Sequence, residues 1–148
     1  MSDNIIKKNL SYLSLLNQNG ETVNIGNFSG KFILLWWFPK ADTPGWTIEG
    51  KGFRDRILEF KQKEIVIFGV SGDLPSENKS FKDKYTFPFD VLSDLELKET
   101  KKIGLCKMED TFAPRVTLIL DRKGFVIDHY DNVDPKTHAL DILTSFKD

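Results

Sequence analysis

The segment of residues 32–60 constrains the fold most, because it combines a buried strand, a tight turn and an amphipathic helix in direct succession. Residues 32–38 are apolar at both odd and even positions, which is typical of a strand buried on both faces of a sheet. Residues 39–45 include two prolines, an aspartate and a glycine, and they predict a turn. Apolar side chains then recur at i, i+4 and i+7, which predicts a helix over about residues 45–61.

Trp46 stands at the start of that predicted helix. A helix N-terminus has free N–H groups and a partial positive charge, so it favours an anion or a thiolate. An indole is neither a nucleophile nor a titratable group. The residue at this position therefore does not match the environment that the local structure provides.

The rest of the chain alternates predicted strands with predicted helices. The expected elements are an N-terminal hairpin over residues 11–25, strands over 64–70, 87–92, 115–120 and 125–130, and helices over 75–85, 93–103 and 134–146. The helix over 93–103 would open on a Ser-x-x-Glu capping box. This order predicts an α/β fold in one domain spanning 1–148, with a central mixed sheet flanked by helices.

Composition narrows the possible partners. The 21 basic and 22 acidic side chains give a net charge of −1, which argues against nucleic acid as a partner. The longest apolar run has seven residues, whereas a membrane span needs about 20. No secretory signal is visible at the N-terminus, so a cytoplasmic location is expected. Cys106 is the single cysteine and both histidines lie far from it in sequence, so neither a metal nor another cofactor is expected.

The turn resembles a known active-site motif. Pro39-x-x-x-Thr43-x-x-Trp46 is similar to the peroxiredoxin motif Pro-x-x-x-Thr-x-x-Cys, with Trp46 in the position of the peroxidatic cysteine. The surrounding sequence resembles that of the PrxQ or bacterioferritin-comigratory-protein subfamily of the AhpC/TSA superfamily. The likeness continues in register through Arg115 to His138, and so covers nearly the whole chain.

This resemblance implies a thioredoxin-like fold and thiol-dependent reduction of hydrogen peroxide or an organic hydroperoxide. It implies an antioxidant role in redox homeostasis, an external thiol reductant such as thioredoxin or glutaredoxin, and a monomer. Thr43 would hydrogen-bond the thiolate and the peroxide, and Pro39 would shield the site from water. Arg115 would stabilise the thiolate and the leaving oxygen, and Glu49 would orient Arg115.

Each of these residues also has a simpler interpretation. Thr43 and Pro39 are ordinary turn residues, Arg115 could be a solvated charge, and Glu49 is a common acid in a first helical turn. Their occurrence together, in the order and spacing of one family, favours the functional interpretation.

Two positions depart from the family pattern. Trp46 replaces the peroxidatic cysteine, and Lys51 occupies the position where some relatives carry a resolving cysteine. The pattern is thus that of a one-Cys enzyme without its nucleophile, and the chain as written is expected to be inactive. Cys106 falls at no recognised catalytic position and is expected to be an inert small residue.

Three explanations for Trp46 remain open. The chain could be a natural relative that lost activity and serves as a binding module, or Trp46 could replace a native cysteine or selenocysteine. Cys106 could also perform redox chemistry in another geometry. We favour the second, because the other site residues all persist around position 46, namely Pro39, Thr43, Glu49 and Arg115. Such a replacement is simple, since Cys and Trp codons differ in one base and UGA encodes selenocysteine, Cys or Trp depending on context. The bulk of Trp46 is expected to distort the first helical turn or to fill the peroxide pocket.

Overall fold

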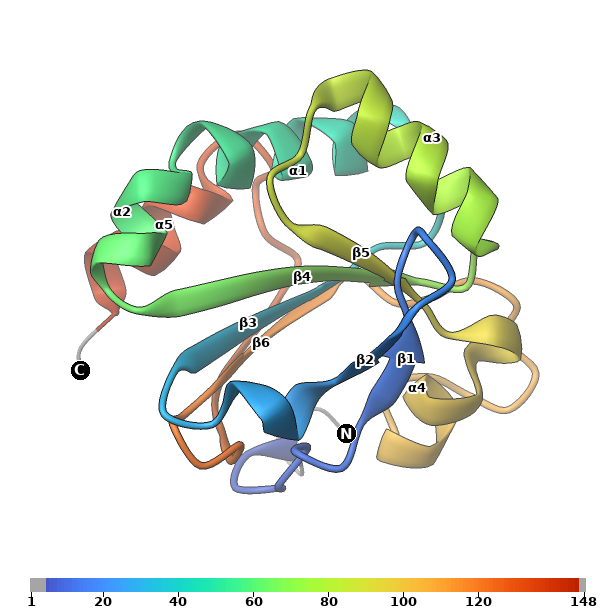
Figure 1. The fold of residues 1–148 in the computed structure, drawn as a ribbon, viewed down its shortest axis with the longest axis horizontal. Helices are drawn as coiled ribbons and strands as arrows, with labels where there is room; N and C mark the ends of the chain where they lie inside the picture. The colour runs from blue at the N-terminus through green and yellow to red at the C-terminus, as the bar shows by residue number, and fades with distance from the viewer. Residues whose placement is uncertain (1–4, 147–148) are drawn as a thin grey trace.

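The computed structural model describes residues 5–146, which form one seven-stranded mixed sheet in the order β2-β1-β5-β4-β3-β6-β7 (Figure 1). The strands are β1 (Ser14–Leu16), β2 (Thr22–Asn24), β3 (Phe32–Trp37), β4 (Ile65–Ser71), β5 (Asp90–Ser93), β6 (Val116–Leu120) and β7 (Val126–Asp131). The helices are η2 (Ile25–Phe28), α1 (Pro44–Asp55), α2 (Ile57–Gln62), α3 (Pro75–Tyr85), η3 (Leu95–Leu97), α4 (Lys98–Ile103) and α5 (His138–Ser145). The predicted mixed sheet with flanking helices is confirmed.

Helices cover both faces of the sheet. The helices α1, α2, α3 and α5 lie over one face, while α4 and the N-terminal segments lie over the other (Figure 1). Each face has its own apolar core, and β3 contributes to both cores through alternate side chains. None of the helices within residues 5–146 is long and apolar enough to cross a bilayer.

The strand β3 lies in the interior of the sheet, as the apolar run predicts. It pairs in parallel with β4 and antiparallel with β6, and all six of its residues are buried. Leu34 and Trp36 face the α1 side, and Leu35 and Trp37 face the α4 side. Burial on both faces accounts for the absence of polar residues from this stretch.

Two local predictions are wrong. The single helix expected over 45–61 is broken at Arg56, whose φ of −113° and ψ of 17° leave the helical region. Its N–H turns back to the carbonyls of Arg54 and Phe53, which ends α1 before α2 begins. The Ser-x-x-Glu capping box does not form either, because Ser93 belongs to β5 and Glu96 adopts a φ of +59°.

Asp94 caps α4 in place of that capping box. Its carboxylate accepts hydrogen bonds from the backbone N–H of Glu99 (3.1 Å) and of Thr100 (2.7 Å), and from the Thr100 hydroxyl (2.6 Å). The Thr100 hydroxyl in turn accepts the indole N–H of Trp37 at 3.0 Å. One buried carboxylate, through Thr100, therefore links the start of α4 to the strand β3.

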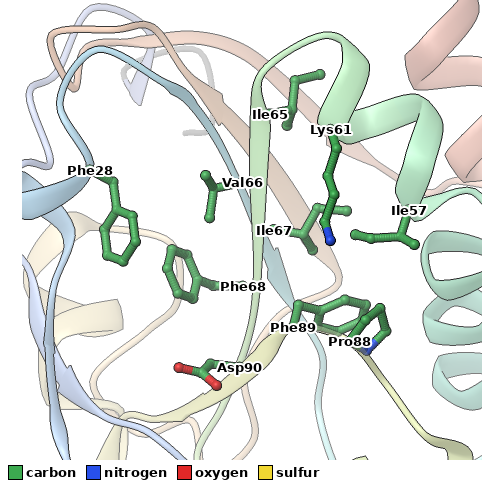
Figure 2. Close-up of a pocket in the computed structure, with 10 residues that line it drawn as sticks. All are labelled: Phe28, Ile57, Lys61, Ile65, Val66, Ile67, Phe68, Pro88, Phe89 and Asp90. Atoms are coloured by element: carbon green, nitrogen blue, oxygen red, sulfur yellow. The ribbon is translucent and has the colours of Figure 1, made fainter.

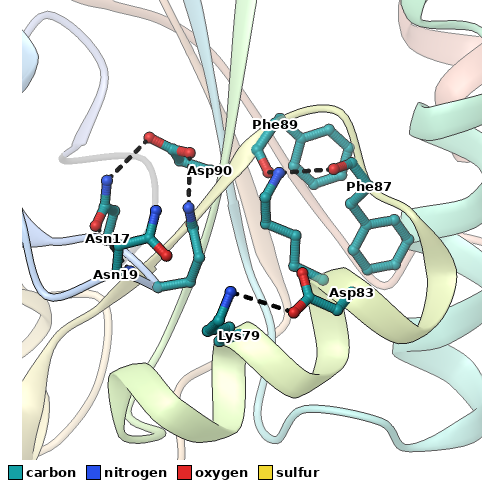
Figure 3. A network of polar contacts seen from close by, with 9 residues as sticks. Asn17, Asn19, Lys79, Asp83, Phe87, Phe89 and Asp90 are labelled. Atoms are coloured by element: carbon teal, nitrogen blue, oxygen red, sulfur yellow. Dashed lines mark hydrogen bonds and ion pairs between the residues drawn. The ribbon is translucent and has the colours of Figure 1, made fainter.

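The predicted N-terminal hairpin is present, but its strands are only three residues long. A single residue pair, Leu16 with Ser93, joins the hairpin to the rest of the sheet. Polar side chains add to this junction. The amides of Asn17 and Gln18 donate to the Asp90 carboxylate, at 3.4 and 3.1 Å (Figure 3).

Candidate functional site

The candidate site lies where β3 passes into α1. Thr43 is the N-cap residue of α1, but its hydroxyl donates to the carbonyl of Lys40 at 2.9 Å instead of accepting a helix N–H. Among the described residues, no side chain caps the first turn of α1. The turn itself is regular, since the N–H of Thr47 donates to the Thr43 carbonyl at 2.9 Å. The helix start therefore keeps the free N–H groups that favour an anion.

The loop before α1 is held in place by two aspartates. Asp73, which follows β4, accepts the N–H of Ala41 at 2.8 Å. Asp42 has a φ of +60°, and its carboxylate accepts hydrogen bonds from Lys84 (2.8 Å) and Tyr85 (2.7 Å) on α3. These hydrogen bonds, that of Lys84 first, lower the pKa of Asp42. Pro39 is half-buried at the start of the same loop.

Trp46 and Arg115 are in direct contact. The guanidinium carbon of Arg115 lies 4.5 Å from the centroid of the indole, which is a cation–π contact worth about 0.5–1 kcal/mol at an exposed site. Arg115 precedes β6, and the pairing of Val116 with Trp37 brings it beside the end of β3. The indole is half-buried and packs against the α1-side core. The bulk of Trp46 is thus accommodated without distorting the helix.

Glu49 lies one turn further along α1 and is only 4% exposed. Burial raises its pKa to about 7, and the Arg115 charge opposes this shift only in part. Within the described part of the chain, Glu49 forms no ion pair with Arg115. Its partner is His138, whose Nε2 lies 3.8 Å from Glu49 Oε1. Glu49 therefore acts on Arg115 only through the electrostatic field.

His138 begins α5 and completes a buried polar cluster beneath α1. Its Nε2 lies 2.9 Å from the hydroxyl of Thr117 on β6, and burial lowers its pKa to about 4. Three buried side-chain atoms in the described structure have no hydrogen-bond partner, and two are His138 Nδ1 and Trp36 Nε1. Sequence reasoning gave His138 no role beside Glu49. The available signal was a lone histidine in line with the apolar face of the last helix.

The remaining two positions lie apart from Trp46. Cys106 packs against the α4-side core, across the sheet from Trp46, and burial raises the pKa of its thiol. The ammonium group of Lys51 lies 5.0 Å from the centroid of the Tyr85 ring, so it contributes to the contact between α1 and α3. Residues 5–146 contain no cluster of three potential metal ligands among His, Cys, Asp and Glu. A cation and free N–H groups thus surround position 46, which itself carries no reactive group.

Known proteins resemble this chain in sequence and in fold. The AhpC/TSA family matches residues 6–129, and the chain belongs to this family. Peroxiredoxin Bcp of Bacillus subtilis (strain 168) is 34% identical over 142 residues, which cover 92% of this chain and 90% of the relative. The chloroplastic peroxiredoxin Q of Populus jackii is 37% identical over 132 residues, which cover 88% of this chain and 62% of that protein.

Within the family, the chain falls in the PrxQ/Bcp subfamily of peroxiredoxins, whose reaction is thiol-dependent peroxide reduction. Solved structures agree. The bacterioferritin comigratory protein of Xanthomonas campestris, described as having alkyl peroxide reduction activity, superimposes with a TM-score of 0.84 at 26% identity, covering 91% of this chain and 90% of that one. Peroxidoxin BcpB of Mycobacterium tuberculosis shares the fold, with a TM-score of 0.85 at 23% identity, 97% coverage of this chain and 98% of its own. The predicted thioredoxin-like fold is confirmed.

Proposed function

We propose that this chain carries a peroxide-reducing site that lacks only its nucleophile, and that with Trp46 it does not turn over peroxide. The main support is the position of Arg115 against residue 46 at the uncapped start of α1. A guanidinium and helix N–H groups stabilise a thiolate or selenolate and the oxyanion that leaves it. An indole is not an anionic nucleophile, so neither the guanidinium nor the N–H groups can activate it.

With a thiol or selenol at position 46, the reaction is a displacement at oxygen. The thiolate attacks one peroxide oxygen and the O–O bond breaks. The other oxygen leaves with its electron pair and takes a proton, giving water or an alcohol. The sulfur becomes a sulfenic acid, which two external thiols reduce with release of water. In this scheme Arg115 stabilises the leaving oxygen, Thr43 hydrogen-bonds the reactants, Pro39 keeps water out, and Glu49 biases Arg115 electrostatically.

A peroxide-consumption assay with dithiothreitol or a thioredoxin system tests this proposal. The unchanged chain and Trp46→Ser should show no turnover, whereas Trp46→Cys should gain it. Adding Arg115→Gln to Trp46→Cys should lower the rate by about 100-fold, since it removes the charge on the leaving oxygen. Turnover by the unchanged chain would refute the proposal, as would a folded Trp46→Cys variant that reduces neither hydrogen peroxide nor cumene hydroperoxide.

The codon for residue 46 in the native gene tests the origin of Trp46. A Cys codon, or a UGA that the source organism reads as selenocysteine or Cys, would mean that the natural protein carries a chalcogen nucleophile here. A UGG would remove that explanation and leave a natural variant with tryptophan. The assay above is independent of this result, because it measures whether the pocket still supports the chemistry.

A second candidate function is a non-enzymatic binding module. The observation that favours it is the stacking of Arg115 on Trp46, because this contact presents an aromatic ring and a cation where relatives carry a reactive cysteine. We further propose a cytoplasmic monomer that uses thioredoxin or glutaredoxin as reductant and binds neither nucleic acid nor membranes. Cys106 would have no redox role, because burial raises the pKa of its thiol.

A further inference from the structure

The sheet contains a gap beside the first half of β4. The strand β4 begins at Ile65, but its neighbour β5 begins only at Asp90, which lies opposite Phe68. On the other side, β3 pairs with β4 from Ile65 onward. Three residues of β4, 65–67, therefore have a partner strand on one side only. At about 3.3 Å per residue, the open edge is about 10 Å long.

The directions of the backbone N–H and C=O groups at this edge follow from the alternation of hydrogen bonds along β4. The carbonyls of Glu64 and Val70 accept N–H groups on the β3 side, whereas the carbonyl of Ser71 accepts the N–H of Asp94 on the β5 side. Because N–H groups alternate in direction along a strand, those of Ile65 and Ile67 point into the gap. No turn or loop hydrogen bond among the described residues involves them. They are donors that face the gap from buried residues, since Ile65 and Ile67 are only 2% and 3% exposed.

A groove of about 300 Å³ occupies the gap, and it is lined from both faces of the sheet (Figure 2). Phe28 and Val66 line it on the α4 side, and Ile57 and Phe89 line it on the α1 side. A groove that straddles a sheet edge in this way has the shape left by a missing strand. A strand in it would place alternate side chains on the two apolar walls.

Two lysines mark one end of the groove. Lys61 lines it, and a neighbouring hollow formed with Ile65 and Val66 brings Lys31 to the same end. Neither lysine has an ion-pair partner among the described residues, whereas Glu64 beside them is paired with Arg122 at 3.3 Å. The unpaired charge at this end is therefore positive. An occupant with a carboxylate there would be electrostatically matched.

We propose that this groove binds an extended segment of another protein by strand addition to β4. The segment would carry β-branched residues at successive positions, so that side chains with methyl groups face both apolar walls, and an acidic residue at the end beside Lys31 and Lys61. Its carbonyls would accept the N–H groups of Ile65 and Ile67, which gives affinity, and the two apolar walls would select the side chains. The proposal does not depend on the residue at position 46.

Amide NMR on the full chain tests the proposal with the peptide acetyl-Asp-Glu-Val-Thr-Val-Thr-amide as probe. At nine-tenths saturation, hydrogen exchange at Ile65 and Ile67 should slow about tenfold, because only the free protein exchanges. The amide of Val66, which faces β3, should change little. An otherwise identical peptide N-methylated at both valines should bind at least fivefold more weakly. Absence of protection at 2 mM peptide, or equal binding of the methylated peptide, would overturn strand addition.

Charge reversal tests the orientation of the segment. The double variant Lys31→Glu with Lys61→Glu should weaken the acidic peptide about tenfold and favour a version with Lys-Lys in place of Asp-Glu. Lys107→Glu, at an exposed position outside the lining of the groove, is the control and should change nothing. Equal loss in the control would overturn the assignment of the lysines. If the Ile65 amide is protected from exchange without peptide, and more so at higher protein concentration, the proposal is overturned in favour of self-association. If decanoate binds in the groove without the peptide, the proposal is overturned in favour of a small amphiphile.

Discussion

Glu49 and His138 carry opposite pKa shifts within one buried pair, and this predicts how stability depends on pH. The pKa of Glu49 is raised to about 7, so the stability that it contributes is complete below 4.5 and is lost as the pH rises through 7. The pKa of His138 is lowered to about 4, so its contribution is complete above 6.5 and is lost as the pH falls through 4. Between pH 4 and 7, the effect of Glu49 lowers stability as the pH rises, whereas the effect of His138 raises it.

We therefore expect Glu49→Gln to stabilise the chain above pH 7, because it removes a carboxylate that is charged and buried there. The gain should be at most about 3 kcal/mol at pH 8 and should vanish below pH 4.5. Urea unfolding at a series of pH values measures it. Glu109→Gln, at an exposed position, is the control and should follow the parent at every pH. A Glu49→Gln variant less stable than the parent at pH 8 would contradict the shift.

At the scale of single residues, the sequence predicted that Arg115 and position 46 lie together, but not the side-chain contacts around them. The spacing from Pro39 to Trp46 and the resemblance at Arg115 were enough to name the residues that meet there. It could not show that the hydroxyl of Thr43 bonds to Lys40, or that Glu49 faces His138, because both depend on side-chain orientation. A contact between residues 89 positions apart is fixed by tertiary packing and leaves no local pattern.

At the scale of elements, Gly50 sets how closely α1 approaches the sheet. A Cβ at this position would lie 2.6 Å from the Phe87 ring and 2.9 Å from Trp36. We expect Gly50→Ala to destabilise the chain by about 1–3 kcal/mol through overpacking. Gly45→Ala, in the first turn of the same helix, meets nothing within 4 Å and should be neutral or stabilising. Thermal unfolding compares the two variants, and an equal effect of both would contradict this explanation.

Asp94 provides a second test at this scale. Asp94→Ala removes the acceptor for two helix N–H groups and for the Thr100 hydroxyl, and we expect a loss of about 2–4 kcal/mol. Asp94→Asn retains one acceptor oxygen and should lose about half as much. Guanidinium unfolding measures both variants. A loss below about 0.5 kcal/mol for the alanine variant would mean that water replaces the carboxylate.

The elements were predicted well where burial decides them and poorly where capping does. The two-sided burial of β3 could be read directly from its sequence. The end of α1 at Arg56 could not, because the apolar periodicity continues through the break. The capping residue of α4 was predicted as Ser93, although the neighbouring carboxylate of Asp94 performs this role.

At the scale of the whole molecule, the N-terminal hairpin is the least connected part of the sheet. One residue pair, Leu16 with Ser93, and the hydrogen bonds from the side chains of Asn17 and Gln18 to Asp90 join it to β5 (Figure 3). Gln18 also accepts the N–H of Val91 at 3.0 Å. We expect Gln18→Ala to speed hydrogen exchange at Leu15 and Leu16 without changing exchange in β3. Equal acceleration in both strands would mean that the hairpin opens only with the whole fold.

The overall architecture could be predicted because alternating strands and helices leave few topologies, and a family resemblance selected one of them. The gap beside β4 could not be predicted in the same way. It depends on β5 starting three residues later than β4 along their shared register, and sequence patterns fix strand ends poorly.

The contact between Arg115 and Trp46 also has a spectroscopic consequence. Trp36 and Trp37 are 0% and 2% exposed, whereas Trp46 is half-buried at the surface of the candidate site. Acrylamide should therefore quench the emission of one indole out of three, and Trp46→Phe should remove that fraction. A ligand that draws the guanidinium away from the ring would change the emission of this indole alone. The tryptophan that takes the place of a nucleophile thus makes occupancy of the site measurable by fluorescence.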